Sequence, residues 1–126
     1  MEELDFASVF EAQPTATAVL SPDLVIRAVN RAYEEMTGHG RAEVVGRHVF
    51  ELPGASSSGP ELRASLDRVL AEGETDIIAI TRYDLEKPGE PGTLEERHWS
   101  VVNAPVPDAD GGVALIVQRI EEITPF

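Results

Sequence analysis

The feature that most constrains the fold is a change in hydrophobic periodicity near the middle of the chain. Three later segments are rich in apolar and β-branched residues and are predicted to be strands: Thr75–Tyr83, Glu95–Val106 and Val113–Ile123. Residues 87–92 indicate a longer loop between the first two strands, and residues 108–112 indicate a hairpin between the last two. No helical pattern separates these strands, so we expect an antiparallel sheet rather than a parallel one.

The beginning of the chain adds a helix and two more strands. Apolar residues at i, i+3 and i+4 predict an amphipathic helix over Asp5–Ala12, which Pro14 ends. Strands are predicted over Thr17–Leu20 and Leu24–Val29, with a Ser-Pro-Asp turn between them. The apolar stripe of the helix needs a surface to cover it, and it consists of Phe6, Val9 and Phe10.

Three further helices are predicted between the two groups of strands. Asn30 is suited to cap a helix that Gly38 ends, and a short helix follows over Ala42–Val45. Residues 54–59 have the composition of a loop, after which Glu61–Glu72 carries the clearest helical stripe. Helices and strands are therefore grouped rather than alternating, which is typical of an α+β domain.

Composition excludes several classes of protein. The 126 residues allow one domain, and their net charge of −13, with no basic stripe, argues against nucleic-acid binding. No apolar run is long enough for a membrane span, and the N-terminus does not resemble a signal peptide, so we expect a cytoplasmic protein. The chain contains no cysteine, which excludes disulfides, thiolate metal sites and cysteine nucleophiles.

No motif in the sequence indicates catalysis. Nucleophile elbows, phosphate-binding glycine loops and His-Glu-x-x-His zinc motifs do not occur in the sequence. Adjacent acidic residues such as Glu34 and Glu35 diverge on a helix or strand instead of converging on a substrate. We therefore expect the chain itself not to be an enzyme.

Several segments, taken in order, are similar to the PAS domain family. They are Val25–Tyr33, Glu43–Arg47, Asn103–Gly112 and the closing Glu122-Ile123-Thr124. The resemblance implies a PAS fold: a five-stranded antiparallel sheet of order 2-1-5-4-3, with short helices over one face and an N-terminal helix. It divides the chain into an N-terminal capping or dimerisation helix (residues 1–14), the PAS domain (15–124) and the start of a linker (125–126).

A narrower resemblance concerns function. Leu62–Leu70, Arg82–Asp84 and Glu96–Ser100 resemble PAS modules that precede bacterial histidine kinases, and the sequence ends soon after Thr124. We therefore expect a sensory and dimerisation module of a larger bacterial signal-transduction protein of the two-component type, with the effector domain in the same parent chain. The alternative is a ligand-free module whose only task is to pair subunits.

On a PAS fold, strand alternation places one set of side chains in a cavity between sheet and helices. The predicted pocket for an unknown small molecule consists of Tyr33, Met36, Phe50, Leu66, Leu70, Trp99, Val101, Asn103, Ile116 and Gln118. Glu122 and Thr124 are predicted to relay the signal to the following segment, and Asp84 and Arg97 to pair across the loop between their strands. Leu115 and Val117 point outward, where the N-terminal stripe or the second subunit of a homodimer is expected to cover them.

The usual PAS cofactors are not expected. Flavin photoreceptors of the family carry a cysteine where this chain has Val49, so no flavin–cysteine bond can form, and noncovalent flavin beside Trp99, Asn103 and Gln118 is a minor alternative. Haem members place their ligand on the long helix, which contains no histidine here. The three histidines, His39, His48 and His98, are predicted to be a solvated turn residue, a helix-start residue and a partly exposed strand residue.

Overall fold

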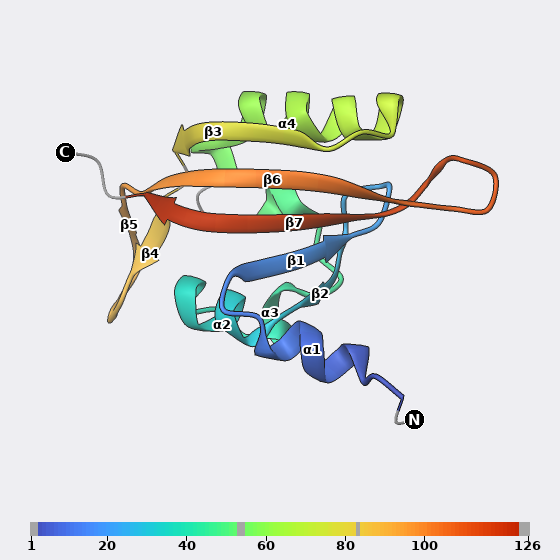
Figure 1. The fold of residues 1–126 in the computed structure, drawn as a ribbon. Coiled ribbons are helices and arrows are strands. Elements are labelled where there is room, and N and C mark those ends of the chain that lie inside the picture. The colour runs from blue at the N-terminus through green and yellow to red at the C-terminus, as the bar shows by residue number, and fades with distance from the viewer. Residues whose placement is uncertain (1–2, 53–54, 83, 124–126) are drawn as a thin grey trace.

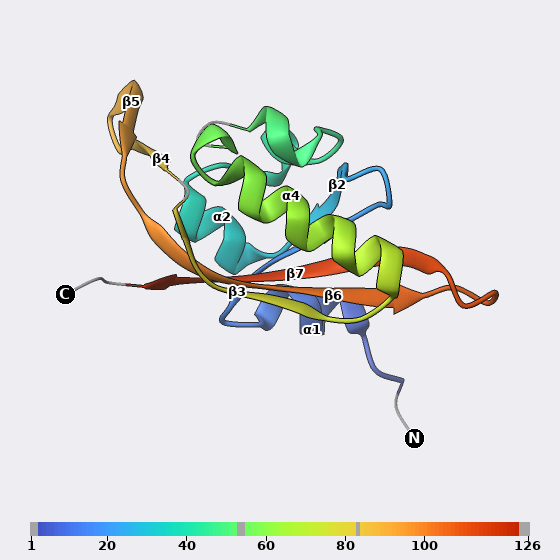
Figure 2. The same cartoon turned by 90° about the horizontal axis from the view of Figure 1, so that it is seen from above.

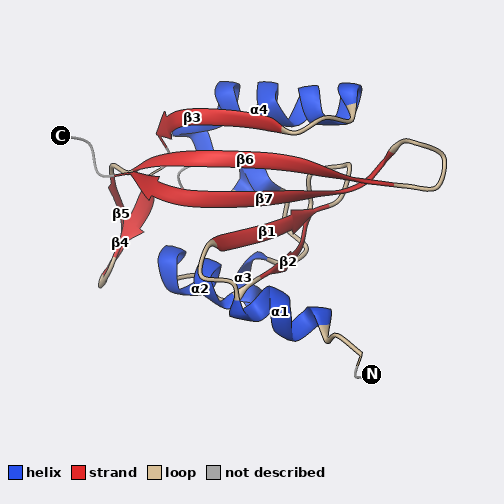
Figure 3. Ribbon diagram, in the orientation of Figure 1, coloured by secondary structure: helices blue, strands red, loops and turns tan. Residues whose placement is uncertain are grey.

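A computed structural model of the chain describes residues 3–52, 55–82 and 84–123, and side chains are not described for residues 55–58. Figure 1 shows the helices and strands in chain order, and Figure 3 separates them by type. The elements are α1 (Phe6–Ala12), β1 (Ala16–Leu20), β2 (Ile26–Val29), α2 (Arg31–Thr37), α3 (Arg41–Val44), the 3₁₀ turn η1 (Val49–Glu51), α4 (Ala55–Glu72), β3 (Asp76–Arg82), β4 (Leu85–Lys87), β5 (Glu90–Glu95), β6 (His98–Pro107) and β7 (Val113–Ile123).

Five strands form one antiparallel sheet in the order β2-β1-β7-β6-β3. This order confirms the predicted 2-1-5-4-3 arrangement once the five strands are numbered along the chain. The long pair β6–β7 sets the register of the sheet centre, where Val101 lies opposite Ile120 and Asn103 opposite Gln118. Figure 2 shows α2 and α4 on one side of the long strands and α1 on the other.

The core lies between the sheet and the helices on its inner face. Leu20, Ile116 and Leu66 are completely buried, and they come from β1, β7 and α4 respectively. Burial of large aliphatic side chains supplies roughly 1.5–3 kcal/mol each. The inner face of the sheet and the inner stripe of α4 therefore account for most of the apolar contact that holds the two layers together.

The predicted ends of α2 are confirmed. Asn30 is its N-cap, and the side chain of Asn30 accepts a hydrogen bond from the backbone N–H of Tyr33. Gly38 ends the helix with a φ of 75°, a left-handed conformation that favours glycine. These two residues set the length of the helix that covers one side of the cavity described below.

Three expectations about individual elements were wrong. Of the predicted loop 54–59, residues 55–59 are helical and residue 54 lies outside the described residues; α4 contains Pro60, whose φ is compatible with a helix although it lacks an N–H donor. Residues 87–92 are not simply a loop, because β4 and β5 form a separate two-stranded sheet. Leu24 has a φ of 65° and belongs to the turn after β1, so β2 begins only at Ile26.

None of the helices among the described residues combines the length and the apolar character required to cross a membrane.

Candidate functional site

A cavity lies between the inner face of the sheet and the short helices. It has a volume of about 50 Å³, which is more than one water molecule occupies, and it is open on one side. Strands β3, β6 and β7 form one wall, and α2, η1, the start of α4 and Leu85 of β4 contribute the remainder. The lining residues are Tyr33, Met36, Thr37, Val49, Leu52, Leu62, Thr81, Leu85, Trp99, Val101, Gln118 and Ile120.

The structure divides the predicted pocket residues into two groups. One group lines the cavity: Tyr33, Met36, Trp99, Val101 and Gln118. The other group lies in the packed core or at its edge, outside the lining: Phe50, Leu66, Leu70, Asn103 and Ile116. Strand alternation brings Trp99 and Val101 to the cavity, but Asn103 lies one step further along β6, beneath α4.

The predicted pocket left out seven lining residues: Thr37, Val49, Leu52, Leu62, Thr81, Leu85 and Ile120. Ile120 and Leu62 were detectable, because Ile120 shares the inward face of β7 with Gln118 and Leu62 belongs to the stripe of α4. Leu85 was not, because it lies in the segment that was expected to lead into a loop. The β4–β5 hairpin turns it toward the helices.

Among the described residues, none that lines the cavity carries a charge at neutral pH. The only titratable group among them is the Tyr33 phenol, and burial raises the pKa of Tyr33 to about 12. The polar lining groups are therefore neutral: the Tyr33, Thr37 and Thr81 hydroxyls and the Gln118 amide. A charged occupant of this space would lose its hydration without gaining a counter-charge from the lining.

A chain of hydrogen bonds leads from the cavity to the surface beneath α4. Gln118 Nε2 donates to Asn103 Oδ1 at 3.0 Å, and Asn103 Nδ2 donates to Ser65 Oγ at 2.9 Å. Asp76 continues the path, because the Arg68 guanidinium, and next the Ser65 hydroxyl, lower the pKa of its carboxyl group. Arg68 Nη2 lies 2.9 Å from Asp76 Oδ2. A lining amide is thus connected to a surface ion pair.

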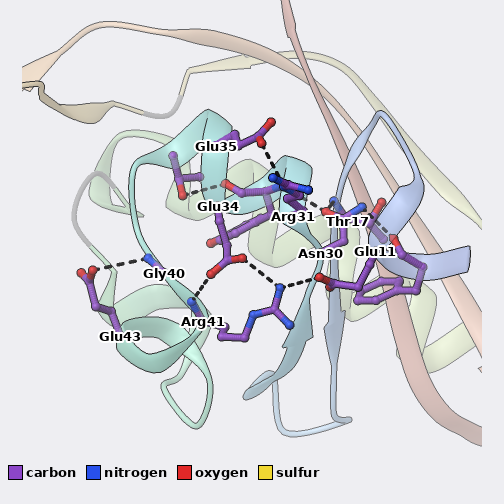
Figure 4. Close-up of polar contacts among 12 residues, drawn as sticks. Glu11, Thr17, Asn30, Arg31, Glu34, Glu35, Gly40, Arg41 and Glu43 are labelled. Atoms are coloured by element: carbon purple, nitrogen blue, oxygen red, sulfur yellow. Dashed lines mark hydrogen bonds and ion pairs between the residues drawn. The ribbon is translucent and has the colours of Figure 1, made fainter. Parts of the chain in front are cut away.

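A second polar network joins α1 to the rest of the domain. Figure 4 shows Asn30 at its centre, where Oδ1 accepts from the backbone N–H groups of Thr17 and Tyr33 at 2.9 and 3.0 Å. Asn30 Nδ2 faces three carbonyls at the end of α1 and beyond it, those of Phe10, Gln13 and Thr15, at 3.3, 3.5 and 3.0 Å. Asn30 therefore connects α1, β1 and α2 through their backbones.

Figure 4 also shows Arg41 between two carboxylates. Arg41 Nη2 lies 2.8 Å from Glu11 Oε2 and 2.8 Å from Glu34 Oε1, and hydrogen bonds from Arg41 lower the pKa of Glu34. Because Glu11 belongs to α1 and Glu34 to α2, this cluster reinforces the attachment of α1. All three side chains are partly exposed, so the ion pairs contribute little individually.

His39 lies near the mouth of the cavity, between two carboxylates. Its Nδ1 is 2.9 Å from Glu43 Oε2, and its Nε2 is 3.5 Å from Glu86 Oε1 on the β4–β5 hairpin. The predicted position just after the helix is confirmed, but the side chain is only 21% exposed and lies beside two carboxylates, so it is less solvated than predicted. His48 accepts a hydrogen bond from the Phe50 N–H at the start of η1, which confirms its predicted position at a helix start.

The predicted relay residues lie at the end of β7. Both carboxylate oxygens of Glu122 accept from Arg97 Nη1, at 3.0 and 2.8 Å, whereas Thr124 lies outside the described residues. The predicted Asp84–Arg97 pair was wrong: Arg97 pairs with Glu122 and Glu95, and Asp84 pairs with Arg82. The antiparallel register causes this, because it places Glu122 opposite Trp99, close to Arg97.

The surface predicted to pair subunits is partly uncovered. Phe6 and Val9 of α1 are 73% and 49% exposed, whereas Phe10 is half-buried. Leu115 and Val117 on the outer face of β7 are also half-buried. On β3, the edge strand beyond β6, Ile77 is 65% exposed. Apolar side chains thus remain accessible on α1 and on the outer face of the sheet.

The residues present do not fit a photochemical flavin–cysteine bond or a clustered metal site. Val49 is buried against the cavity at the position where the photoreceptor resemblance would place a cysteine, and the chain contains no thiol. Among the described residues, no group of three or more His, Cys, Asp or Glu side chains is arranged to hold a metal ion.

Comparison with known proteins gives one family and several structural relatives. Residues 10–126 match the PAS fold family. Blue-light-activated histidine kinase 1 of Erythrobacter litoralis is 31% identical over 91 residues, which are 71% of this chain and only 23% of that protein. The chain therefore spans about a quarter of that relative.

Solved structures resemble this one along nearly the whole chain. The PAS domain of a protein from Colwellia psychrerythraea has a TM-score of 0.77 at 15% identity, with 94% of each chain covered. The PAS domain of nitrogen regulation protein NR(II) from Vibrio parahaemolyticus has a TM-score of 0.71 at 15% identity, covering 96% of this chain and 100% of that one. At such identities the resemblance establishes the fold.

Proposed function

The chain belongs to the PAS fold family, and we propose that it is the sensory and dimerisation module of a larger bacterial signalling protein. In this proposal residues 1–14 pair two subunits, residues 15–124 bind a small molecule, and residues 125–126 begin the linker to an effector. The effector is a histidine kinase, which the 31% identity to a kinase of that class supports. The module itself carries no catalytic group.

The observation that carries this proposal is the cavity. A space of about 50 Å³ lies among the lining side chains, and Trp99 and Tyr33 supply large apolar surfaces to it. Protein interiors are otherwise packed with few voids larger than a water molecule. An apolar space that exceeds one water molecule and opens to the surface therefore favours a binding site over an ordinary packed core.

Glu122 supports the proposed relay. It joins the end of β7 to Arg97, which lies between β5 and β6 at the base of the hairpin. Leu85 of the same hairpin lines the cavity. A bound molecule that moves the hairpin would therefore change the contact between Arg97 and Glu122 at the end of β7, just before Thr124. Such coupling requires a ligand that binds more tightly to one position of the hairpin than to the other.

A metabolite screen by thermal denaturation tests this function. We expect at least one compound to raise the melting temperature in proportion to its concentration. The variant Val101→Phe places a larger side chain in the cavity and should abolish the response. Val102→Phe is the matched control, because Val102 is the next residue of β6 and points to the outer face. Uniformly flat responses would contradict a small-molecule sensor.

The second candidate function is pairing of subunits without a ligand. The exposed apolar side chains of α1 favour it, because a monomer rarely leaves large apolar surfaces uncovered without an interaction role. Sedimentation of Phe10→Glu tests the interface. A parent that sediments as a dimer and a variant that sediments as a monomer would support pairing through α1, and identical sedimentation of the two would exclude this stripe as the interface.

A further inference from the structure

An irregularity in β3 determines which of its side chains reach the cavity. Ile78 lies opposite Val101 and Thr81 opposite Trp99, so three steps along β3 match two steps along β6. This is the geometry of a β-bulge, in which one extra residue interrupts the alternation of a strand. Strict alternation from Ile78 would turn Ile80 inward and Thr81 outward. The bulge reverses this arrangement.

The bulge exposes an apolar side chain and buries a polar one, whereas burial of apolar surface would favour the reverse. Ile80 is 63% exposed, whereas Thr81 is only 4% exposed and lines the cavity. Among the described residues Thr81 Oγ1 has no hydrogen-bond partner. Burying a hydroxyl without a partner costs on the order of 1–3 kcal/mol in proteins. The bulge therefore lowers the stability of the fold, because it exposes Ile80 and buries the Thr81 hydroxyl without a partner among the described residues.

Thr37 provides an internal comparison. It also lines the cavity, but its hydroxyl donates to the Tyr33 carbonyl at 2.9 Å and accepts from the His39 N–H at 3.2 Å. That hydroxyl is used by the fold and is not available to an occupant. Of the two lining threonines, Thr81 alone retains an unused hydrogen-bonding group within the described part of the chain.

We propose that Thr81 is the recognition residue of the cavity, and that the ligand is an uncharged, largely apolar ring compound with a hydroxyl or carbonyl group that bonds to Thr81 Oγ1. We infer an apolar ring because the apolar side chains of Trp99, Val101 and Ile120 lie together on adjacent strands and line the cavity. The absence of charge in the ligand follows from the described lining residues, which include no ionised side chain. Rotation about the Cα–Cβ bond of Thr81 orients the hydroxyl toward the bound group. This inference rests on the proposed function, since it assumes that the cavity is a binding site.

Three probes with one ring test the inference: p-cresol, toluene and p-toluate. They share a methylated benzene ring and differ in carrying a hydroxyl, no polar group, or a carboxylate that is ionised at neutral pH. Trp99 is the only tryptophan, so the protein has a single indole N–H signal that reports occupancy in a proton–nitrogen correlation spectrum. We expect p-cresol to bind roughly tenfold more tightly than toluene, and p-toluate roughly tenfold more weakly than toluene.

The variant Thr81→Val removes the hydroxyl and keeps the shape of the side chain. We expect it to reduce p-cresol affinity to that of toluene while toluene affinity stays unchanged. Thr37→Val is the matched control and should keep the preference for p-cresol. An unchanged preference in Thr81→Val would overturn the role of Thr81, and p-toluate binding as tightly as toluene would overturn the uncharged ligand class.

Thermal denaturation without any probe gives a second measurement. Because the Thr81 hydroxyl has no partner, Thr81→Val should melt at the same temperature as the parent or at a higher one, whereas Thr37→Val should melt lower. A loss of stability in Thr81→Val equal to that in Thr37→Val would contradict an unpartnered hydroxyl. Failure of all three probes would overturn this inference alone, because the metabolite screen with Val101→Phe decides the proposed function separately.

Discussion

The two asparagines of this chain are both completely buried, yet they are bonded in different ways. Within the described part of the chain, the side chain of Asn30 bonds only to backbone groups, from α1 to α2. The side chain of Asn103 bonds, among the same residues, only to the side chains of Gln118 and Ser65. Backbone groups in regular structure cannot turn away to find other partners, whereas side chains can rotate. The comparison suggests that Asn30 fixes the architecture, and that Asn103 lies in a network able to respond to the cavity.

The largest expected effect is that of Asn30→Ala. It leaves the N–H groups of Thr17 and Tyr33 without their acceptor and the carbonyls near the end of α1 without their donor. Since each unsatisfied buried group costs about 1–3 kcal/mol, we expect a loss of about 4 kcal/mol in the free energy of unfolding, measured in urea. We also expect faster proteolysis between α1 and β1. A loss below about 1 kcal/mol would contradict an architectural role.

A smaller effect is expected for Asn103→Ala. Gln118 Nε2 and Ser65 Oγ lose their partner, but both side chains can rotate, and Gln118 already lines the cavity. We expect a loss of about 2 kcal/mol in urea unfolding, together with a changed affinity for p-cresol as Gln118 turns toward the cavity. A variant that unfolds as readily as Asn30→Ala, with unaltered p-cresol affinity, would remove the distinction between the two asparagines.

Ser65→Ala tests the next step of the Asn103 network, the hydrogen-bonded path from Gln118 through Asn103 and Ser65 to Asp76. Ser65 is completely buried and accepts from Asn103 Nδ2 at 2.9 Å. Replacement by alanine keeps a good helix-forming residue in α4 and removes the hydrogen bonds of the Ser65 hydroxyl to Asn103 and to the Asp76 carboxyl, so we expect a loss of about 1.5 kcal/mol. Exposed Ser8 on α1 provides the control: its replacement by alanine should cost less than half as much, because water can replace the Ser8 hydroxyl that donates to Asp5 Oδ2. Equal losses for the two serines would show that burial does not strengthen this network.

Residues close in sequence were easier to predict than partners brought together by the fold. The strand order and Asn30 as a cap followed from hairpin signals, the resemblance and local spacing. The bond between Asn103 and Ser65 joins residues 38 positions apart and depends on how α4 lies on the sheet. The orientation of Thr81 depends on a bulge that interrupts strand alternation, so a period-two pattern assigns it to the wrong face. The β4–β5 hairpin was predicted as a loop because its two Pro-Gly pairs are typical of turns and loops.

The smallest expected effect lies at the surface end of the Asn103 network and depends on pH. The Arg68 guanidinium, with the Ser65 hydroxyl, lowers the pKa of Asp76 from its ordinary value of 3.8. A carboxyl group whose pKa is lower in the folded state stabilises the fold at pH values above 3.8, and this contribution disappears as the pH falls through the lower folded value. Because the Arg68 side chain is half exposed, the contribution is about 0.5 kcal/mol.

Asp76→Asn tests this end of the network, with urea unfolding of parent and variant compared across the acidic range. We expect the parent to be more stable than the variant at neutral pH, and the difference to vanish well below pH 3.8, where the folded-state carboxyl is protonated. Strong salt should also reduce the difference at neutral pH, since the pair is screened. A difference that stays constant from neutral to acidic pH would show that the carboxylate charge contributes nothing. The Asn103 network would then end at Ser65, inside the protein, without an electrostatic connection to the surface.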